Sequence, residues 1–244
     1  SSTTSSAMRP VDEAIVLAGG LGTRLRSVVA DLPKPLAPVC GRPFVAYLLD
    51  LLANHGMRRA VLATGYLGEQ VESALGTSWQ GMELIYSHEP EPLGTGGAIA
   101  LALQHIYGTA CFVLNGDTYL KLDYAAFDAQ TRRHDAALGI ALAEVADAAR
   151  YGAVEIGNGC VHAFAEKGRH GPGYINAGVY LIKRELLDAF PSGSRFSFET
   201  DVMQPMVGRR TVAAFTATQG FIDIGVPEDY ARAQHALCQQ ESAA

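Results

Sequence analysis

The feature that most restricts the fold of this chain is an alternation of short β-rich runs with helical patterns in its first half. Strand-like runs and helical spacing of apolar residues follow one another over 14–18, 43–56, 60–64, 67–75, 83–86, 98–106 and 111–114. This alternation is typical of a parallel sheet whose strands are joined by crossover helices. We therefore predict an α/β fold, a Rossmann-like three-layer arrangement with a mixed, mostly parallel sheet.

Beyond about residue 136 the pattern changes to a series of strand-like stretches. They cover 137–142, 153–156, 161–164, 175–182 and 211–215, with helical stretches at 183–189 and 199–206. These strands either extend the first sheet or build a smaller lobe over it. A last helix is expected over about 227–240, with Pro227 in its first turn.

Length and composition indicate one soluble globular domain over 8–244. The chain has 244 residues, 48% hydrophobic and 18% charged. We interpret residues 1–7, which precede Met8, as a remnant of cloning. The net charge of −6 argues against a broad basic face for nucleic acid or a membrane, and no apolar run approaches the roughly 18 residues of a spanning helix. We expect a cytoplasmic protein.

The cysteines carry no metal or disulfide pattern. They are Cys40, Cys111, Cys160 and Cys238, which are far apart and form no CxxC pair. We therefore predict reduced thiols, as is usual in the cytoplasm, and neither a disulfide framework nor a structural zinc site.

The stretch LAGGLGTRL, residues 17–25, follows the first predicted strand and has the composition of a phosphate-binding loop. A dinucleotide fingerprint would need an acidic residue after the second strand, where Ala63-Thr64-Gly65 stands, and its glycine spacing differs. The P-loop pattern is also absent, because Arg24 rather than a lysine closes the turn. What remains is a loop whose free N–H groups can converge on a polyphosphate, with Thr23 and Arg24 as further donors.

A second short segment, Pro33-Lys34-Pro35, presents a lysine between two prolines. The prolines stiffen the chain on both sides of Lys34, and a fixed ammonium group suits a phosphate that bears developing charge. Taken singly, the glycine loop is compatible with a tight turn and the proline segment with an exposed loop. Their occurrence together favours a phosphate site.

The two segments together resemble the opening signature of the sugar-phosphate nucleotidyltransferase family, GGxGTRL followed by PKP. The resemblance extends from Ala14 to about Gln234. It implies in-line transfer of a nucleoside monophosphate to a sugar 1-phosphate, with release of pyrophosphate. It also implies a nucleotide-binding part over about 13–135 and a smaller sugar-phosphate-binding part over about 136–225.

The resemblance further implies site residues and a cofactor. Mg²⁺ would be held by Asp117, after a predicted strand, and by Asp223, before the last helix, while Arg24 and Lys34 would act on the phosphates. The residues implied to bind the nucleotide are Leu17, Ala18, Gly19, Gly20, Gly22, Thr23, Glu89, Gly94, Thr95, Asn115 and Gly116. The residues implied to bind the sugar phosphate are Gly152, Glu166, Lys167, Asn176 and Gly178. By their sequence alone, the Asn115–Asp117 and Gly152 segments are also compatible with plain turns, and Glu166-Lys167 with a surface ion pair.

The residues alone do not show which nucleotide base the protein binds, so this inference rests on the resemblance. Glu91–Ala98, Phe196–Glu199 and Phe221–Tyr230 look most like family members that use GTP and D-glycero-alpha-D-manno-heptose 1-phosphate, giving GDP-heptose for surface glycans. Alternatives are a uridylyl- or thymidylyltransferase for glucose or N-acetylmuramate 1-phosphate, and a non-catalytic regulator that binds nucleotide sugar. The oligomeric state, including a homodimer, stays open.

Overall fold

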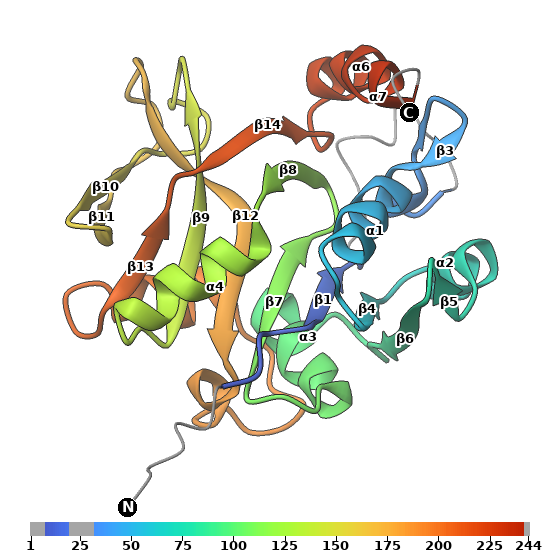
Figure 1. The fold of residues 1–244 in the computed structure, drawn as a ribbon, viewed down its shortest axis with the longest axis horizontal. Helices are drawn as coiled ribbons and strands as arrows, with labels where there is room; N and C mark the ends of the chain where they lie inside the picture. Colours follow the sequence, from blue (N-terminus) through green and yellow to red (C-terminus); the bar gives the residue numbers. More distant parts are fainter. Residues whose placement is uncertain (1–7, 20–31, 242–244) are drawn as a thin grey trace, which may run out of the picture.

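The structure is a computed structural model that describes residues 8–19 and 32–241 (Figure 1). Within these residues the main sheet has ten strands in the order β10-β11-β13-β9-β12-β7-β1-β4-β6-β5. The bounds of its strands are β1 Glu13–Leu17, β4 Arg59–Thr64, β5 Ser78–Trp79, β6 Met82–His88, β7 Ala110–Asn115, β9 Leu138–Val145, β10 Val154–Gly157, β11 Cys160–Phe164, β12 Gly173–Lys183 and β13 Val212–Phe215. The part of the predicted phosphate-binding loop within residues 20–31 lies outside the described residues.

The four strands β7, β1, β4 and β6 form a parallel block that is covered on both faces. Strands β7, β1, β4 and β6 are parallel neighbours. Helix α1 (Phe44–Asn54) packs on one face with Ala14 and Val16, whereas α3 (Gly94–Ala102) packs on the other with Ile15. Because successive strand residues point to opposite faces, the continuous apolar run of β1 contributes to two cores. The predicted three-layer α/β fold is confirmed.

The later strands extend the same sheet. β12 runs antiparallel to both β7 and β9, and β13 runs parallel to β9. β10 and β11 form an antiparallel edge (Figure 1). The sheet is therefore mixed, with three of its parallel pairs in the block from β7 to β6 and a fourth between β13 and β9.

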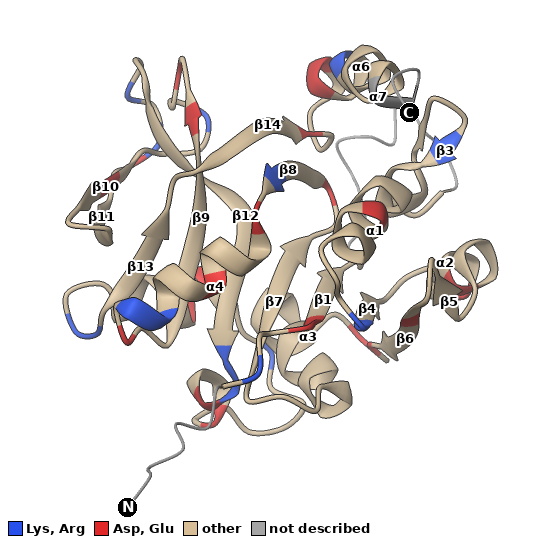
Figure 2. Ribbon diagram, in the orientation of Figure 1, with Lys and Arg blue, Asp and Glu red and all other residues tan. Residues whose placement is uncertain are grey.

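Short elements complete the fold and position the loops of the site. Helices α2 (Gly68–Leu75) and α4 (Tyr124–Arg133) and a 3₁₀ turn at Leu103–His105 lie between strands. A small antiparallel sheet pairs β8 (Thr118–Leu122) with β14 (Thr218–Asp223), and a hairpin pairs β2 (Pro38–Val39) with β3 (Arg42–Pro43). The chain then continues into α6 (Pro227–Ala236) and α7 (Cys238–Glu241). Cationic and acidic side chains are interspersed along these elements (Figure 2).

Two helical predictions differ from the structure, and one helix was not predicted. The expected helix at 183–189 is a 3₁₀ turn over Arg184–Leu187, and the one at 199–206 is a π-helical segment, Phe198–Met203, followed by the short α5, Gln204–Met206. Helix α4 was not predicted. Its buried positions include Asp128 and Thr131, so apolar spacing does not reveal it, although Asp123 caps its first turn.

The prediction of four reduced, unpaired cysteines is wrong for one pair. Cys40 and Cys238 form a disulfide with a Cα–Cα distance of 5.7 Å. The β2–β3 turn contacts both α6 and α1: the Gln234 amide of α6 donates to the Pro38 carbonyl, and the Tyr47 hydroxyl of α1 donates to the Val39 carbonyl. Sequence spacing could not show this proximity, because it arises only when the C-terminal helix packs beside the hairpin.

Candidate active site

The two predicted metal-binding aspartates are neighbours in the structure. Asp117 follows the end of β7 and directly precedes β8, while Asp223 ends β14. The pairing of β8 with β14 sets Thr118 opposite Asp223, and the Ile224 N–H donates to the Asp117 carbonyl at 2.9 Å. The small sheet thus joins carboxylates that are far apart in the sequence.

Lys34 reaches the same place from a rigid turn. Pro33 and Pro35 flank it, and a 3₁₀ turn over Lys34–Leu36 buries Pro35 and Leu36 beneath it. The Lys34 Nζ atom donates to Asp117 Oδ2 at 2.8 Å, with the side chains 18% and 32% exposed. The buried residues Pro35 and Leu36 anchor the turn, and the Lys34 ammonium group faces the two aspartates.

Gly225 marks the point where the three charged groups converge. A Cβ atom at Gly225 would lie 2.9 Å from Asp223 Oδ1, 3.1 Å from Lys34 Nζ and 3.4 Å from Asp117 Oδ2. Burial and the charge of Asp117 raise the pKa of Asp223, whereas the Gly225 N–H, the Tyr151 hydroxyl and Lys34 lower it. The carboxylates of Asp117 and Asp223 are therefore close enough to repel each other.

The donor set at this point fits a hard divalent cation. The carboxylates of Asp117 and Asp223 converge on the position that a Cβ at residue 225 would take. Because residue 225 is glycine, no side chain fills that position. Among the described residues, no third His, Cys, Asp or Glu completes a metal-binding group. Mg²⁺ commonly takes one or two carboxylates and fills its other positions with water and substrate phosphates, so the residues present suit it.

The nucleotide end of the predicted site lies where β1 and β7 finish. The Ala18 N–H donates to Ala63 at 2.8 Å, and the Gly116 N–H donates to Leu17 at 2.9 Å. A Cβ at Gly116 would overlap the Leu17 carbonyl, so only glycine permits this contact, while Asn115 ends β7 beside it. Gly19 follows at the strand edge. Four predicted residues, Gly20, Gly22, Thr23 and Arg24, lie outside the described residues.

Glu89 faces this glycine edge from the end of β6. Its Oε2 atom accepts the Leu93 N–H at 3.0 Å, and its Oε1 atom lies 3.5 Å from the position that a Cβ at Gly19 would take. Burial raises the pKa of Glu89, and the Leu93 N–H and His88 lower it in part. One carboxylate oxygen thus fixes the loop that follows, and the other faces Gly19.

The glycines of the Leu93–Ala98 segment pack against protein. A Cβ at Gly94 would overlap the Phe196 carbonyl and one at Gly96 would overlap the Phe196 ring. The Gly96 N–H donates to Phe196 at 3.0 Å, and the Thr95 Oγ1 accepts the Phe198 N–H at 2.9 Å. Their small size therefore serves the fit of this loop to the 196–198 segment.

Two of the predicted sugar-phosphate residues lie on β12, the strand next to β7. Gly178 forms a bulge in β12 at a φ of 79°, and a Cβ there would lie 2.7 Å from the Asn115 amide nitrogen. Asn176 accepts the Gly178 N–H and donates to the Tyr180 hydroxyl at 2.7 Å. The structure therefore brings Gly178 beside Asn115, and Asn176 holds the Gly178 backbone.

Gly152 and the Glu166-Lys167 pair form the other predicted part of the sugar site. Gly152 has a φ of 80°, and a Cβ there would lie 2.6 Å from the Ala165 carbonyl and 3.7 Å from Lys167 Cγ. The side chains of Glu166 and Lys167 are exposed. Glycine at 152 is thus what allows its loop to lie against the segment that carries this pair.

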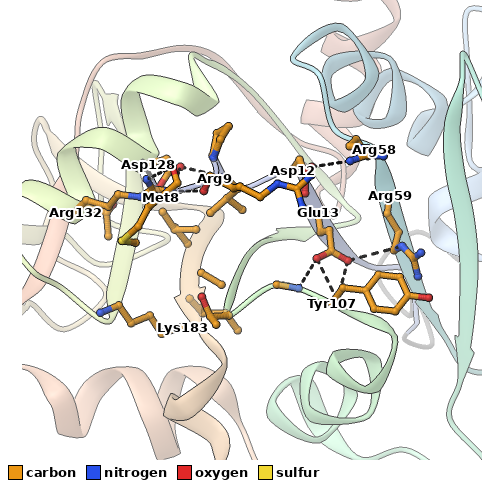
Figure 3. Close-up of a pocket in the computed structure, with 18 of the residues that line it drawn as sticks. Met8, Arg9, Asp12, Glu13, Arg58, Arg59, Tyr107, Asp128, Arg132 and Lys183 are labelled. Atoms are coloured by element: carbon orange, nitrogen blue, oxygen red, sulfur yellow. Dashed lines mark hydrogen bonds and ion pairs between the residues drawn. The ribbon is translucent and has the colours of Figure 1, made fainter. Parts of the chain in front are cut away.

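A cavity of about 630 Å³ lies at the opposite edge of the sheet, near the beginnings of β1 and β4 (Figure 3). Its carboxylates are already engaged: Glu13 accepts the N–H groups of Tyr107 and Gly108, and Asp128 accepts those of Val11 and Arg132. We locate the candidate chemistry at the converging carboxylates, because this cavity contains none of the predicted site residues.

A comparison with protein families decides the affiliation. The model of the family described as nucleotidyl transferase matches residues 13–240. The chain belongs to the nucleotidyl transferase family. The resemblance noted in the sequence is thereby confirmed.

Similar proteins cover nearly the whole length of this nucleotidyl transferase. It is 40% identical over 225 residues to D-glycero-alpha-D-manno-heptose 1-phosphate guanylyltransferase of Aneurinibacillus thermoaerophilus, which covers 92% of this chain and 98% of that protein. The protein of the same name from Campylobacter jejuni is 37% identical over 219 residues, covering 89% and 96%. The crystal structure of HddC from Yersinia pseudotuberculosis has a TM-score of 0.83 at 38% identity, covering 93% and 100%, and its complex with GMP-PN has a TM-score of 0.82.

The structure of this nucleotidyl transferase places further candidate residues near the predicted site that sequence reasoning did not assign. The Tyr151 hydroxyl donates to Asp223 Oδ2 at 3.1 Å, and burial and Asp223 raise its pKa to about 12. Gly225 supplies the space described above. Glu199 is half-buried, and burial and Asp117 raise its pKa whereas Lys167 lowers it. The FSFE segment that carries Glu199 was recognised only as a point of resemblance, because one glutamate in an aromatic stretch has no distinctive spacing.

Proposed function

We propose that this chain transfers GMP from GTP to D-glycero-alpha-D-manno-heptose 1-phosphate, forming GDP-heptose and pyrophosphate. The convergence of Lys34, Asp117 and Asp223 on one point beside Gly225 carries the proposal of phosphoryl chemistry. The names and the coverage of the two guanylyltransferase relatives support the choice of substrates. Because GTP and sugar phosphates are cytoplasmic metabolites, the proposal places the enzyme in the cytoplasm.

The reaction is one in-line displacement. A phosphate oxygen of the sugar 1-phosphate forms a bond to the α-phosphorus of GTP, and the bond from that phosphorus to the bridging oxygen breaks. Pyrophosphate leaves with the electron pair. No general base is assigned, since the second pKa of a phosphate monoester is about 6 and the nucleophile is already mostly ionised at neutral pH.

The protein's task is to align two anions and offset their charge. Lys34 would donate to oxygens of the reacting phosphates, and Lys167 would hold the attacking sugar phosphate. Arg24 would act on the leaving pyrophosphate. Asp117 and Asp223 would hold Mg²⁺, which when bound supplies electrostatic stabilisation of charge on phosphate oxygens.

Glu89 supplies a physical reason for preferring GTP. Guanine presents two adjacent donors, N1–H and the N2 amino group, and a carboxylate is an acceptor-only group that can receive both. Glu89 lies at the glycine edge with one oxygen facing Gly19. Uracil and thymine present a single N–H between two carbonyl groups. The oxygens of these carbonyls would be repelled by a carboxylate.

The test is a pyrophosphate-release assay that crosses GTP, UTP, dTTP, CTP and ATP with heptose, mannose and glucose 1-phosphates. GTP with the heptose is expected to give the highest kcat/KM, and Asp117→Asn is expected to abolish release in a folded protein. If another pair is best, the substrate assignment fails. Tight binding of GDP-heptose without turnover would favour the regulatory alternative.

A further inference from the structure

Glu199 is the half-buried glutamate of the FSFE segment. Its neighbour Phe198 packs against β12, the strand that carries the predicted sugar-site residues Asn176 and Gly178. The Phe198 ring packs edge-on against the Tyr180 ring, with their centroids 5.2 Å apart, and the Tyr180 hydroxyl accepts from Asn176. Ser197 closes the turn, since its Oγ accepts the Thr200 N–H. Glu199 is therefore set beside the Asn176 side of the site by the packing of its immediate neighbour.

The same segment is also fixed by the loop at the nucleotide end. The Phe196 N–H donates to the Leu93 carbonyl at 3.0 Å and the Gly96 N–H donates back to Phe196 at 3.0 Å. The Phe198 N–H donates to Thr95 Oγ1. Two independent attachments thus define where the Glu199 backbone lies, which is the support that a binding group requires.

The charged groups that act on Glu199 are both site residues, Lys167 and Asp117. Within the described part of the chain, neither Glu199 nor Lys167 forms an ion pair or a side-chain hydrogen bond, so more than 4.0 Å separates the carboxylate from the ammonium group. A half-buried carboxylate with unused acceptors costs free energy unless something donates to it. Glu199 thus has acceptor capacity to offer a ligand.

The chemistry of this carboxylate narrows the class of ligand. The described residues contain no group of three metal-binding side chains, so Glu199 does not join Asp117 and Asp223 as a third ligand. A carboxylate repels phosphate oxygens. Hydroxyl groups are the donors that a sugar phosphate offers.

We propose that Glu199 is a substrate-binding residue that accepts hydrogen bonds from hydroxyl groups of the sugar whose phosphate is held by Lys167. The inference rests on the proposed function, because it assumes a sugar 1-phosphate as acceptor substrate. The sugar site would then have a second carboxylate in addition to the exposed Glu166, and this one is fixed by β12 and by the Leu93–Gly96 loop.

The test compares Glu199→Gln with wild type in the full chain with Mg²⁺. Binding of heptose, mannose and glucose 1-phosphates is measured by calorimetry in the presence of a non-hydrolysable GTP analogue, and KM is measured where turnover occurs. Loss of a hydrogen bond to a charged group predicts a 10- to 100-fold weaker Kd and a KM raised by the same factor. The Kd of the GTP analogue is expected to stay within twofold, and Glu199→Asp to recover part of the loss. Glu185→Gln, an exposed glutamate paired with Arg210, is the matched control.

Unchanged sugar-phosphate binding in Glu199→Gln would overturn the proposal. Equal weakening of the GTP analogue and the sugar phosphate would also overturn it, since that result indicates a structural role. Failure of the substrate assignment can be told apart from failure of the Glu199 proposal. If the assignment is wrong, wild type binds another sugar 1-phosphate best, and the effect of Glu199→Gln is then measured on the binding of that sugar phosphate. If wild type binds none of the three, both proposals fail.

Discussion

The Lys34 Nζ atom lies 2.8 Å from Asp117 Oδ2, and the same ammonium group is one of the charges that lower the pKa of Asp223. Lys34 comes from the proline turn after β1, whereas the aspartates come from the β8–β14 sheet. One cation thus offsets the repulsion of two carboxylates supplied by a different part of the fold. This relationship gives the lysine a role in ordering the site as well as a proposed role on the phosphates.

Replacing Lys34 with alanine is expected to lower kcat by about 100- to 1000-fold, the effect of removing one preorganised donor to a charged transition state. The Tm should change little, because the buried parts of the turn are Pro35 and Leu36. Pyrophosphate release and thermal unfolding check both statements. Lys121→Ala, an exposed lysine on β8, is the control and should keep wild-type activity. Normal kcat in Lys34→Ala would remove its assigned role.

Gly225→Ala should damage the site while leaving the fold intact. The added methyl group would lie 2.9 Å from Asp223 Oδ1 and 3.1 Å from Lys34 Nζ, so both groups must move. The shifts that relieve these contacts are a few tenths of an ångström. Because a displacement of about 1 Å in a reacting constellation can cost about 100-fold in kcat/KM, we expect a smaller loss, of about 10-fold. Gly173→Ala is the matched control, since its methyl group would make ordinary contacts at 3.5 and 3.6 Å. Equal activity of the two variants would show that no ligand group needs the space at Gly225.

Glu89→Gln is expected to reduce kcat/KM for GTP by about 10- to 100-fold, because the amide replaces one acceptor with a donor that opposes the guanine donors. Activity with UTP or dTTP should fall less or rise, since their carbonyls accept from that amide. Competition assays between GTP and UTP measure the ratio. Glu91→Gln, two residues away and exposed, should leave it unchanged. An unaltered ratio in Glu89→Gln would argue that the base is read elsewhere.

The parallel half of the fold was predictable because its information is local. The apolar run of β1 and the helical spacing that precedes Gly56 each specify one element, and crossover connections then fix the layers. The order of the later strands was not predictable. Whether β9 and β12 extend the sheet depends on which distant strands pair, and that pairing leaves no local mark in the sequence.

The site divides in the same way. Lys34 was identifiable from its flanking prolines, and Asp117 from its place at the end of a strand. The proximity of Asp117 and Asp223 came from family resemblance alone, since the β8–β14 register that produces it joins two short strands that were not predicted. Glu199 was beyond sequence reasoning for a related reason: its surroundings depend on contacts of Phe198 with Tyr180 and Thr95.

A last prediction concerns stability. The Tyr124 hydroxyl is buried and has no hydrogen-bond partner among the described residues, although its ring packs edge-on against Phe112 and His55. Tyr124→Phe keeps the ring contacts and removes an unsatisfied polar group, so the free energy of unfolding should rise by about 1 kcal/mol. Tyr47→Phe is the matched contrast, because the Tyr47 hydroxyl donates to the Val39 carbonyl at 2.8 Å and its loss should lower that free energy by about 1 kcal/mol. Urea denaturation of both variants measures the two changes; a destabilised Tyr124→Phe would mean that its hydroxyl contributes a hydrogen bond in solution.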